Sequence, residues 1–184
     1  MDLELTLKER LTLANQYEIL AKLSDDKYDT DYYNNLSKIL IKGFSRNYYE
    51  LISEFDKDGL SQEECKFVVD VLNLYREFRF SWRESKEVRD NLEESKTLFK
   101  GFDLNENSNL LGYYEYLVKD AGLWTEIKDL MKEGKIKDFN SHGNFPYINK
   151  LKEMLKKWEE VKIKKGEDDV SGMLTLEEIN YIWK

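Results

Sequence analysis

Proline is almost absent from this sequence, which contains one Pro and nine Gly among 184 residues. Because these two residue types most often interrupt regular structure, long segments of the chain carry no such break. Within these segments apolar side chains recur every three or four residues, which is the period of a helix and not the alternation of a strand. The sequence therefore predicts an all-α fold. Its length favours a single domain over residues 1–184, since domains most often have about 100–150 residues.

Capping boxes mark three helix starts. In each box a Ser or Thr side chain and the Glu three residues later accept hydrogen bonds from free backbone N–H groups of the first turn. The three pairs are Thr6–Glu9, Ser61–Glu64 and Thr175–Glu178. Further helices are expected over residues 31–41, ending at Gly43, and over residues 48–55, 110–118, 123–131 and 148–161. The spacing in the first helix predicts one buried face, formed by Leu7, Leu11, Ala14 and Tyr17 and extended by Ile19, Leu20 and Leu23.

The segment from Cys65 to Trp82 has apolar residues on two helix faces. One face carries Cys65, Val68, Val69, Leu72 and Tyr75, and the other carries Phe67, Val71, Leu74 and Phe78. A helix that is apolar on both faces is normally surrounded by other helices. We therefore expect a compact multi-helix domain around a central buried helix at about residues 61–80. The charged segment 84–96 that follows is expected to be a solvated helix face or a mobile connector, with Val88 and Leu92 as its apolar anchors.

Composition excludes several classes of protein. Acidic residues (37) outnumber basic ones (29), giving a net charge of −8, which argues against nucleic-acid or anionic-membrane partners because these need a concentrated basic surface. Aromatic residues make up 14% of the chain, too many for a disordered protein. One Cys and one His exclude an internal disulfide and a Cys/His zinc cage, and we predict neither a metal nor a cofactor. No segment approaches about 20 apolar residues or resembles a signal peptide, so a cytoplasmic location is expected.

His142 is the obvious candidate for acid–base chemistry, because histidine alone titrates near neutral pH. It lies in a run of turn-forming residues, 140–146. Ser141 beside it is not a catalytic partner, since sequence neighbours usually point apart. The simplest interpretation is a polar loop whose side chains cap helix ends. The alternative is a hydrolase that uses His142 with Asp103.

Cys65 and the segment 167–178 are two further candidates. Cys65 lies in the first turn of a helix, where the dipole favours a thiolate, but it shares the buried stripe and has no basic neighbour, so we expect a core cysteine. Residues 167–178 resemble an EF-hand loop, with Gly172 at the sixth place and Glu178 at the twelfth. Glu167 stands where the loop needs Asp, and Glu178 is explained by the capping box. Calcium binding by this degenerate loop is the weaker alternative.

Aromatic side chains crowd into residues 99–124, together with Asp103, Asn105 and Asn109. Core packing explains most of them, but Tyr and Trp around a few fixed polar groups also make a plausible ligand pocket. The candidate ligand-binding residues are Asp103, Tyr113, Trp124, Asn140 and His142. The abundance of aromatic residues also predicts a homodimer. Its best candidate contact is the terminal helix with Ile179, Ile182 and Trp183, unless that helix folds back onto its own core.

Several stretches together resemble the YfbU family, a bacterial family of largely unknown function. They include residues 11–17, 64–65, 70–75, 81–82, 101–103, 110–113, 142–143, 154–155 with Trp158, and 177–180. These stretches follow the family's order over nearly the whole chain. In some relatives the domain is joined to a helix-turn-helix module, which implies a ligand-binding role, and the resemblance implies no catalytic residue. We therefore favour a non-enzymatic domain that senses a small ligand or docks a protein partner, and we leave the hydrolase open as the alternative.

Overall fold

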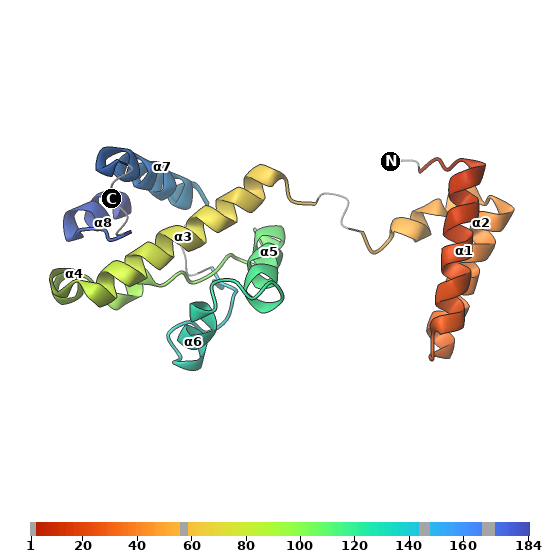
Figure 1. Ribbon diagram of the computed structural model, residues 1–184, viewed down its shortest axis with the longest axis horizontal. Helices are drawn as coiled ribbons and strands as arrows, with labels where there is room; N and C mark the ends of the chain where they lie inside the picture. Colours follow the sequence, from red (N-terminus) through yellow and green to blue (C-terminus); the bar gives the residue numbers. More distant parts are fainter. Residues whose placement is uncertain (1–2, 56–58, 144–147, 167–171) are drawn as a thin grey trace. The chain divides into compact units, whose positions relative to one another are not determined.

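The computed structural model describes residues 3–55, 59–143, 148–166 and 172–184, and helices dominate it (Figure 1). The described residues contain a single isolated bridge, between Phe102 and Asn140, and no strand. The all-α prediction is therefore confirmed. In chain order the helices are α1 (Leu7–Leu23), α2 (Lys27–Lys42), the 3₁₀ helix η1 (Ser45–Ile52), α3 (Gln62–Glu84), α4 (Lys86–Asn91), the 3₁₀ helix η2 (Glu94–Thr97), α5 (Ser108–Lys119), α6 (Glu126–Lys132), α7 (Ile148–Lys165) and α8 (Leu176–Trp183).

Contacts divide the chain into two compact units, Met1–Asp58 and Gly59–Lys184, which we call the N-unit and the C-unit. Each has its own hydrophobic core. All four tryptophans of the sequence lie in the C-unit. The expectation of one domain over residues 1–184 stays a prediction, and the two units are described separately below.

The N-unit is a hairpin of α1 and α2 followed by η1. The Thr6–Glu9 capping box starts α1, and the Asp26 side chain caps α2 by accepting hydrogen bonds from two backbone N–H groups. Gly43 ends α2 in the left-handed conformation, at φ 66°. Across the hairpin the Arg10 side chain donates from Nε to the Leu40 carbonyl oxygen at 2.8 Å. The core consists of Ala14, Leu36, Ile39, Leu40, Tyr48 and Leu51.

The predicted buried face of α1 is wrong for most of its members. Two residues of α1 are fully buried, Ala14 and Ala21, and the prediction named only Ala14. The reason is that apolar residues occupy nearly every side of this helix, whereas the hairpin covers only the stripe that faces α2. Tyr17 is half-buried, and the exposed side chains are Leu7, Leu11, Ile19, Leu20 and Leu23.

The C-unit is built around α3, as the sequence predicted. In Figure 1, α3 runs through this unit with α7 and α8 on one side and α5 and α6 on the other. The Ser61–Glu64 capping box starts the helix. Its buried side chains come from both predicted faces and are Val68, Val71, Leu72, Leu74, Tyr75, Phe78 and Ser81. A helix covered on both faces fixes the positions of the elements that pack on it.

The terminal helix α8 packs onto this core. Ile179 and Ile182 are fully buried, and the Trp183 ring stacks on Phe78 with 6.1 Å between ring centroids. The Ser81 hydroxyl, buried in α3, accepts a hydrogen bond from the Leu174 N–H at 2.7 Å just before α8 begins. The alternative given for this helix, that it folds back onto its own core, is therefore what the structure shows for Ile179 and Ile182. The homodimer stays a prediction.

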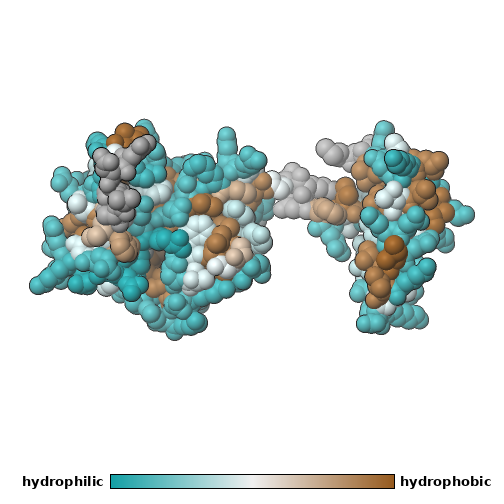
Figure 2. Space-filling model, in the orientation of Figure 1, coloured by the Kyte–Doolittle hydropathy of each residue, from teal (hydrophilic) through white to brown (hydrophobic). Residues whose placement is uncertain are grey.

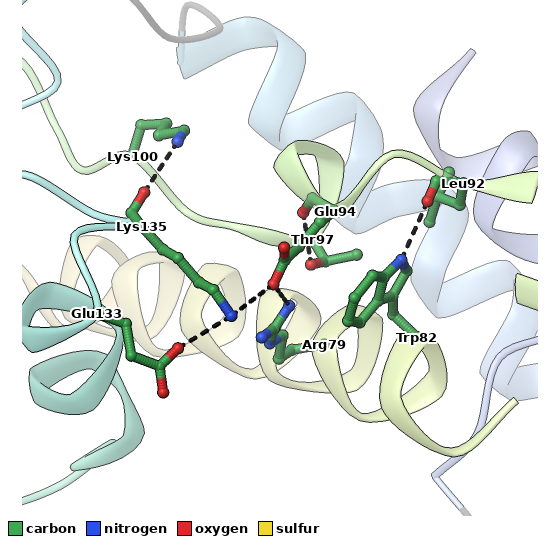
Figure 3. A network of polar contacts seen from close by, with 8 residues as sticks. All are labelled: Arg79, Trp82, Leu92, Glu94, Thr97, Lys100, Glu133 and Lys135. Carbon is green, nitrogen blue, oxygen red and sulfur yellow. Dashed lines mark hydrogen bonds and ion pairs between the residues drawn. The ribbon is translucent and has the colours of Figure 1, made fainter. Parts of the chain in front are cut away.

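The charged segment 84–96 is anchored to α3. It forms α4 and η2, and the predicted anchors Val88 and Leu92 are both buried. The Trp82 indole donates from Nε1 to the Leu92 carbonyl oxygen at 3.0 Å. Figure 3 shows how a polar network continues from here: the Glu94 carboxylate lies 2.6 Å from Arg79 Nη1 and 2.8 Å from Lys135 Nζ. This carboxylate therefore joins α3 to the loop that follows α6.

Replacing Glu94 by Gln is expected to reduce the free energy of unfolding by about 1–2 kcal/mol at neutral pH, because two cations lose their shared, partly exposed partner. Two hydrogen bonds lower the pKa of the Glu94 carboxyl: the one from Lys135 has the larger effect, and the one from Arg79 the smaller. A carboxyl with a lowered pKa stabilises the fold above its unfolded pKa, near 4.5, and this contribution is lost as the pH falls through the folded pKa.

Urea denaturation at neutral pH and near pH 3 measures this difference. The gap between the native protein and Glu94→Gln should be present at neutral pH and shrink at acid pH. Glu93→Gln, at an exposed neighbouring carboxylate, is the matched control and should change stability little. A gap that is as large at pH 3 would contradict the assignment of the effect to the Glu94 charge.

Candidate functional site

Two loops of the C-unit that lie far apart in sequence are joined edge to edge. The parallel bridge pairs Phe102 with Asn140, and the Ser141 N–H donates to the Phe102 carbonyl oxygen at 3.0 Å. The Asn140 side chain extends the junction, since its Oδ1 accepts from the Leu104 N–H at 3.2 Å and from the His142 N–H at 2.9 Å. These contacts fix residues 101–104 against residues 139–142.

Gly101 makes this close approach possible. Its φ is +99°, which L-residues with side chains rarely adopt. A Cβ atom at this position would lie 1.8 Å from the Phe139 carbonyl oxygen, so the approach of the two backbones also leaves no space for a side chain. Beneath the junction the Phe139 ring meets Tyr114 edge to face, with 4.9 Å between centroids. The junction is thus anchored on the aromatic core.

A pocket of about 490 Å³ opens at this junction. It brings together three of the five predicted ligand-binding residues, Asp103, Asn140 and His142. The apolar part of its wall includes Phe102, Ile148 and Leu151. Within the described residues that line it there is no Lys or Arg. The remaining lining residues are Gly101, Asn105, Glu106, Asn107, Ser141 and Gly143.

Asp103 organises the loop that leads into α5. Its Oδ1 accepts from the backbone N–H groups of Asn105 at 2.9 Å and Glu106 at 3.2 Å, which closes a tight turn. The Asn107 N–H donates to the Asp103 carbonyl oxygen at 2.8 Å, and α5 begins at the next residue. Asp103 therefore has a fixed place in the wall of the pocket.

His142 is paired with a residue that the sequence analysis did not single out. Its Nε2 lies 3.0 Å from Asp138 Oδ2, and both side chains are partly exposed. The hydrogen bond from His142 lowers the pKa of the Asp138 carboxyl. His142 also has a positive φ, of 50°, which is uncommon for a residue other than glycine. In the described part of the chain no hydrogen bond joins His142 to Asp103, so the two residues invoked for a hydrolase line one pocket without being hydrogen-bonded to each other.

Tyr113 and Trp124 do not line this pocket. Tyr113 lies on α5, where its ring stacks on Tyr116 at 6.2 Å between centroids; burial, followed by the neighbouring Cys65, raises the pKa of its hydroxyl. Trp124 is buried, and the Arg76 guanidinium lies 5.1 Å from the centroid of its ring. Cys65 itself is half-buried at the edge of the core.

In the described ranges of the chain, no group of three or more His, Cys, Asp or Glu side chains is placed to hold a metal ion. Of the calcium-loop residues, 167–171 lie outside the described residues. Glu178 accepts from the Thr175 N–H at 2.8 Å, as the capping box requires, and lies 3.2 Å from Lys165 Nζ. No described helix combines the length and the apolar character needed to span a bilayer.

The family model of the YfbU domain matches residues 3–184. The chain belongs to the YfbU family. This match includes both units, so the N-unit and the C-unit are both parts of the YfbU domain. Two of the stretches in which the sequence resembles the family, residues 101–103 and 142–143, line the pocket although about 40 residues separate them. The resemblance noted from the sequence is thereby confirmed.

Proposed function

We propose that this YfbU domain is a non-enzymatic, cytoplasmic ligand-binding domain that serves bacterial regulation, and that the pocket at the 101–104 and 139–142 junction is its ligand site. The observation that carries the proposal is that Asp103, Asn140 and His142, chosen from the sequence as ligand-binding residues, line one pocket. Small-molecule sites commonly combine an apolar wall with a few fixed polar groups, and this pocket has both.

The lining chemistry favours a small aliphatic amine. Asp103 and Glu106 provide carboxylates, and the described wall provides no Lys or Arg that would compete for them. Asn140 and Ser141 add neutral hydrogen-bonding groups, and Leu151 adds an apolar surface. An ammonium group next to Asp103 would gain a charge-assisted hydrogen bond, while the alkyl part of the ligand would cover the apolar wall.

Backbone conformations at the pocket support a functional role. His142 has a positive φ, and residues other than glycine that are held in such sparsely populated conformations tend to cluster at ligand-binding and active sites. The tight junction keeps this conformation in place before any ligand arrives. A preformed pocket of this kind lowers the entropic cost of binding.

Thermal unfolding in the presence of a panel of primary amines, polyamines and amino acids, with carboxylic acids of matching size, tests the proposal. At a ligand concentration of 100 times Kd the stabilisation is about 2.7 kcal/mol, which shifts the melting temperature by several degrees. We expect amines to produce this shift and carboxylic acids not to do so. Asp103→Asn should remove the shift, because Asn preserves the turn geometry but not the charge.

Asp90→Asn, at an exposed carboxylate on α4, is the matched control and should retain the shift. An equal loss in both variants, or no shift with any amine, would refute the amine site. A shift that is produced instead by a purified protein partner would favour the docking function that the sequence analysis left open. No direct binding of nucleic acid is expected in either case.

The hydrolase remains the second candidate because Asp103 and His142 line the same pocket. The pairing of His142 with Asp138 makes the hydrolase the weaker candidate. A general base needs its imidazole directed at the proton that it removes, and here the imidazole is directed at Asp138. Turnover of a generic ester substrate that disappears in His142→Gln and persists in Asp90→Asn would favour this candidate over the binding domain.

A further inference from the structure

The C-unit has a second hollow, which lies between α3 and α6 and has a volume of about 950 Å³. We call it the α3–α6 groove. One wall is formed by α3, which contributes Arg76, Arg79 and Arg83, and the other wall is formed by α6 and the residues that follow it. Small-molecule sites commonly have volumes of about 300–1,000 Å³, so this groove has room for an organic ligand.

The groove concentrates positive charge in an acidic protein. Among its described lining residues five are Lys or Arg and four are Asp or Glu, whereas the chain as a whole has a net charge of −8. The three carboxylates on the α6 side are each paired with a cation of the groove, at 2.5–2.9 Å, and Glu84 is exposed at the end of α3. Arg79 and Arg83 therefore have no carboxylate partner among the lining residues described. The three pairs are Arg76–Glu126, Lys132–Asp129 and Lys135–Glu133.

Arg79 and Arg83 lie one helical turn apart on this wall. The Arg79 guanidinium is held in place, because it lies 4.9 Å from the centroid of the Trp82 ring and shares the Glu94 carboxylate with Lys135 (Figure 3). The Arg83 side chain is exposed and makes no ion pair or hydrogen bond with a described residue. Like charges at this spacing destabilise a helix, so an anion bound between the two guanidiniums would relieve their repulsion. A guanidinium has five N–H donors, which leaves both arginines with donors for such an anion.

Apolar side chains line the groove next to these arginines. Figure 2 shows that hydrophilic residues cover most of the visible face of the C-unit and leave separate apolar patches. Within the groove, Phe80 lies between Arg76 and Arg83 at helical spacing and is 43% exposed. Leu130 lines the groove from α6 and is half-buried. An exposed ring beside guanidiniums can stack on an aromatic group of a ligand while the guanidiniums bind its anionic group.

We propose that the α3–α6 groove is a second ligand site, which binds a small phosphate ester with an aromatic group, such as a mononucleotide. Arg79 and Arg83 bind the phosphate, and Phe80 stacks on the aromatic group. A phosphate monoester carries a charge of about −1.5 to −2 at pH 7 and three acceptor oxygens, so it can accept from both guanidiniums at once. A carboxylate, with one charge and two oxygens, fits the pair less well. This site is independent of the amine site, because the two share no described lining residue.

Isothermal titration calorimetry of the full chain with adenosine monophosphate tests the site, and adenosine and inorganic phosphate are the probes for its two halves. Adenosine monophosphate should bind saturably. Adenosine and inorganic phosphate should each bind at least about tenfold more weakly, because each lacks one of the two contacts. The absence of saturable binding up to about 5 mM adenosine monophosphate would overturn the proposal. Equal affinity for adenosine monophosphate and either probe would also overturn it.

Arg83→Gln should raise the Kd of adenosine monophosphate by about tenfold or more, since it removes a charge-assisted hydrogen bond to the phosphate. Lys86→Gln is the matched control, because Lys86 is exposed on α4, carries the same charge and does not line the groove. It should leave the Kd nearly unchanged. Equal weakening by these two variants would overturn the proposal, because the effect would then follow net charge and not the groove.

Phe80→Ala tests the aromatic contact. It should weaken the binding of adenosine monophosphate and leave that of inorganic phosphate unchanged. Tyr116→Ala is its control, because Tyr116 is 52% exposed on α5 and lies outside the groove. All of these variants should keep the helical circular dichroism of the native protein. Native affinity for adenosine monophosphate in Phe80→Ala would overturn the assignment of an aromatic ligand.

Discussion

Gly101→Ala is expected to lower the free energy of unfolding of the C-unit by about 2–6 kcal/mol. Two costs combine here: about 1–3 kcal/mol for holding a side chain at φ +99° and a further 1–3 kcal/mol for overpacking against the Phe139 carbonyl oxygen. The backbones would have to separate, which would open the junction and deform the pocket. Amine binding should therefore be lost together with stability.

Substitutions at two other glycines of the C-unit measure the cost of strain apart from the cost of overpacking. Gly134 has φ +71° and open space where a Cβ would lie, so Gly134→Ala should cost only the strain of about 1 kcal/mol. Gly112 lies within α5 with no positive φ and no nearby atoms, so Gly112→Ala should stabilise the helix by about 0.5–1 kcal/mol. Urea denaturation of the three variants measures the series. Similar losses at Gly101 and Gly134 would show that the junction tolerates a methyl group.

Phe78→Ala is expected to destabilise the C-unit by about 3–5 kcal/mol, the range observed when a fully buried aromatic ring is truncated and the cavity does not collapse. Phe78 has no exposed surface, and its ring contacts Tyr75 edge to face at 5.5 Å and Trp183 at 6.1 Å between centroids. Loss of this ring therefore removes packing contacts of α8 as well as packing contacts within α3. We expect the terminal helix to become more accessible to protease in this variant.

Phe80→Ala is the control for this change, because Phe80 lies two residues later in α3 and is 43% exposed. It should cost about 1 kcal/mol or less. Urea denaturation followed by circular dichroism measures both variants, and limited proteolysis follows α8. Equal losses from Phe78 and Phe80 would contradict the central position of α3 in the C-unit.

Local signals in the sequence identified the features that depend on neighbouring residues. Each capping box is formed as predicted, because its hydrogen bonds join residues only three apart. The central position of α3 also followed from its two apolar faces. Spacing alone does not say which face of a helix meets a partner, and for this reason Leu7 and Leu11 were predicted to be buried although they are exposed.

The site was predictable only in part. Asp103, Asn140 and His142 were chosen as polar residues near aromatic or turn-forming segments, and all three line the pocket. Their proximity depends on a bridge between residues 102 and 140, which leaves no periodic pattern in the sequence. Asp138 was missed, although its position four residues before His142 was a usable signal for an Asp–His pair.

The confinement of all four tryptophans to the C-unit has an optical consequence. Indole fluorescence excited at its red edge reports on the C-unit alone, whereas the N-unit contains six tyrosines and contributes only to tyrosine emission. Far-ultraviolet dichroism, in contrast, measures the helices of both units. Comparing the two signals resolves the melting of each unit in the unlabelled protein, and a single indole transition is not a measure of the whole chain.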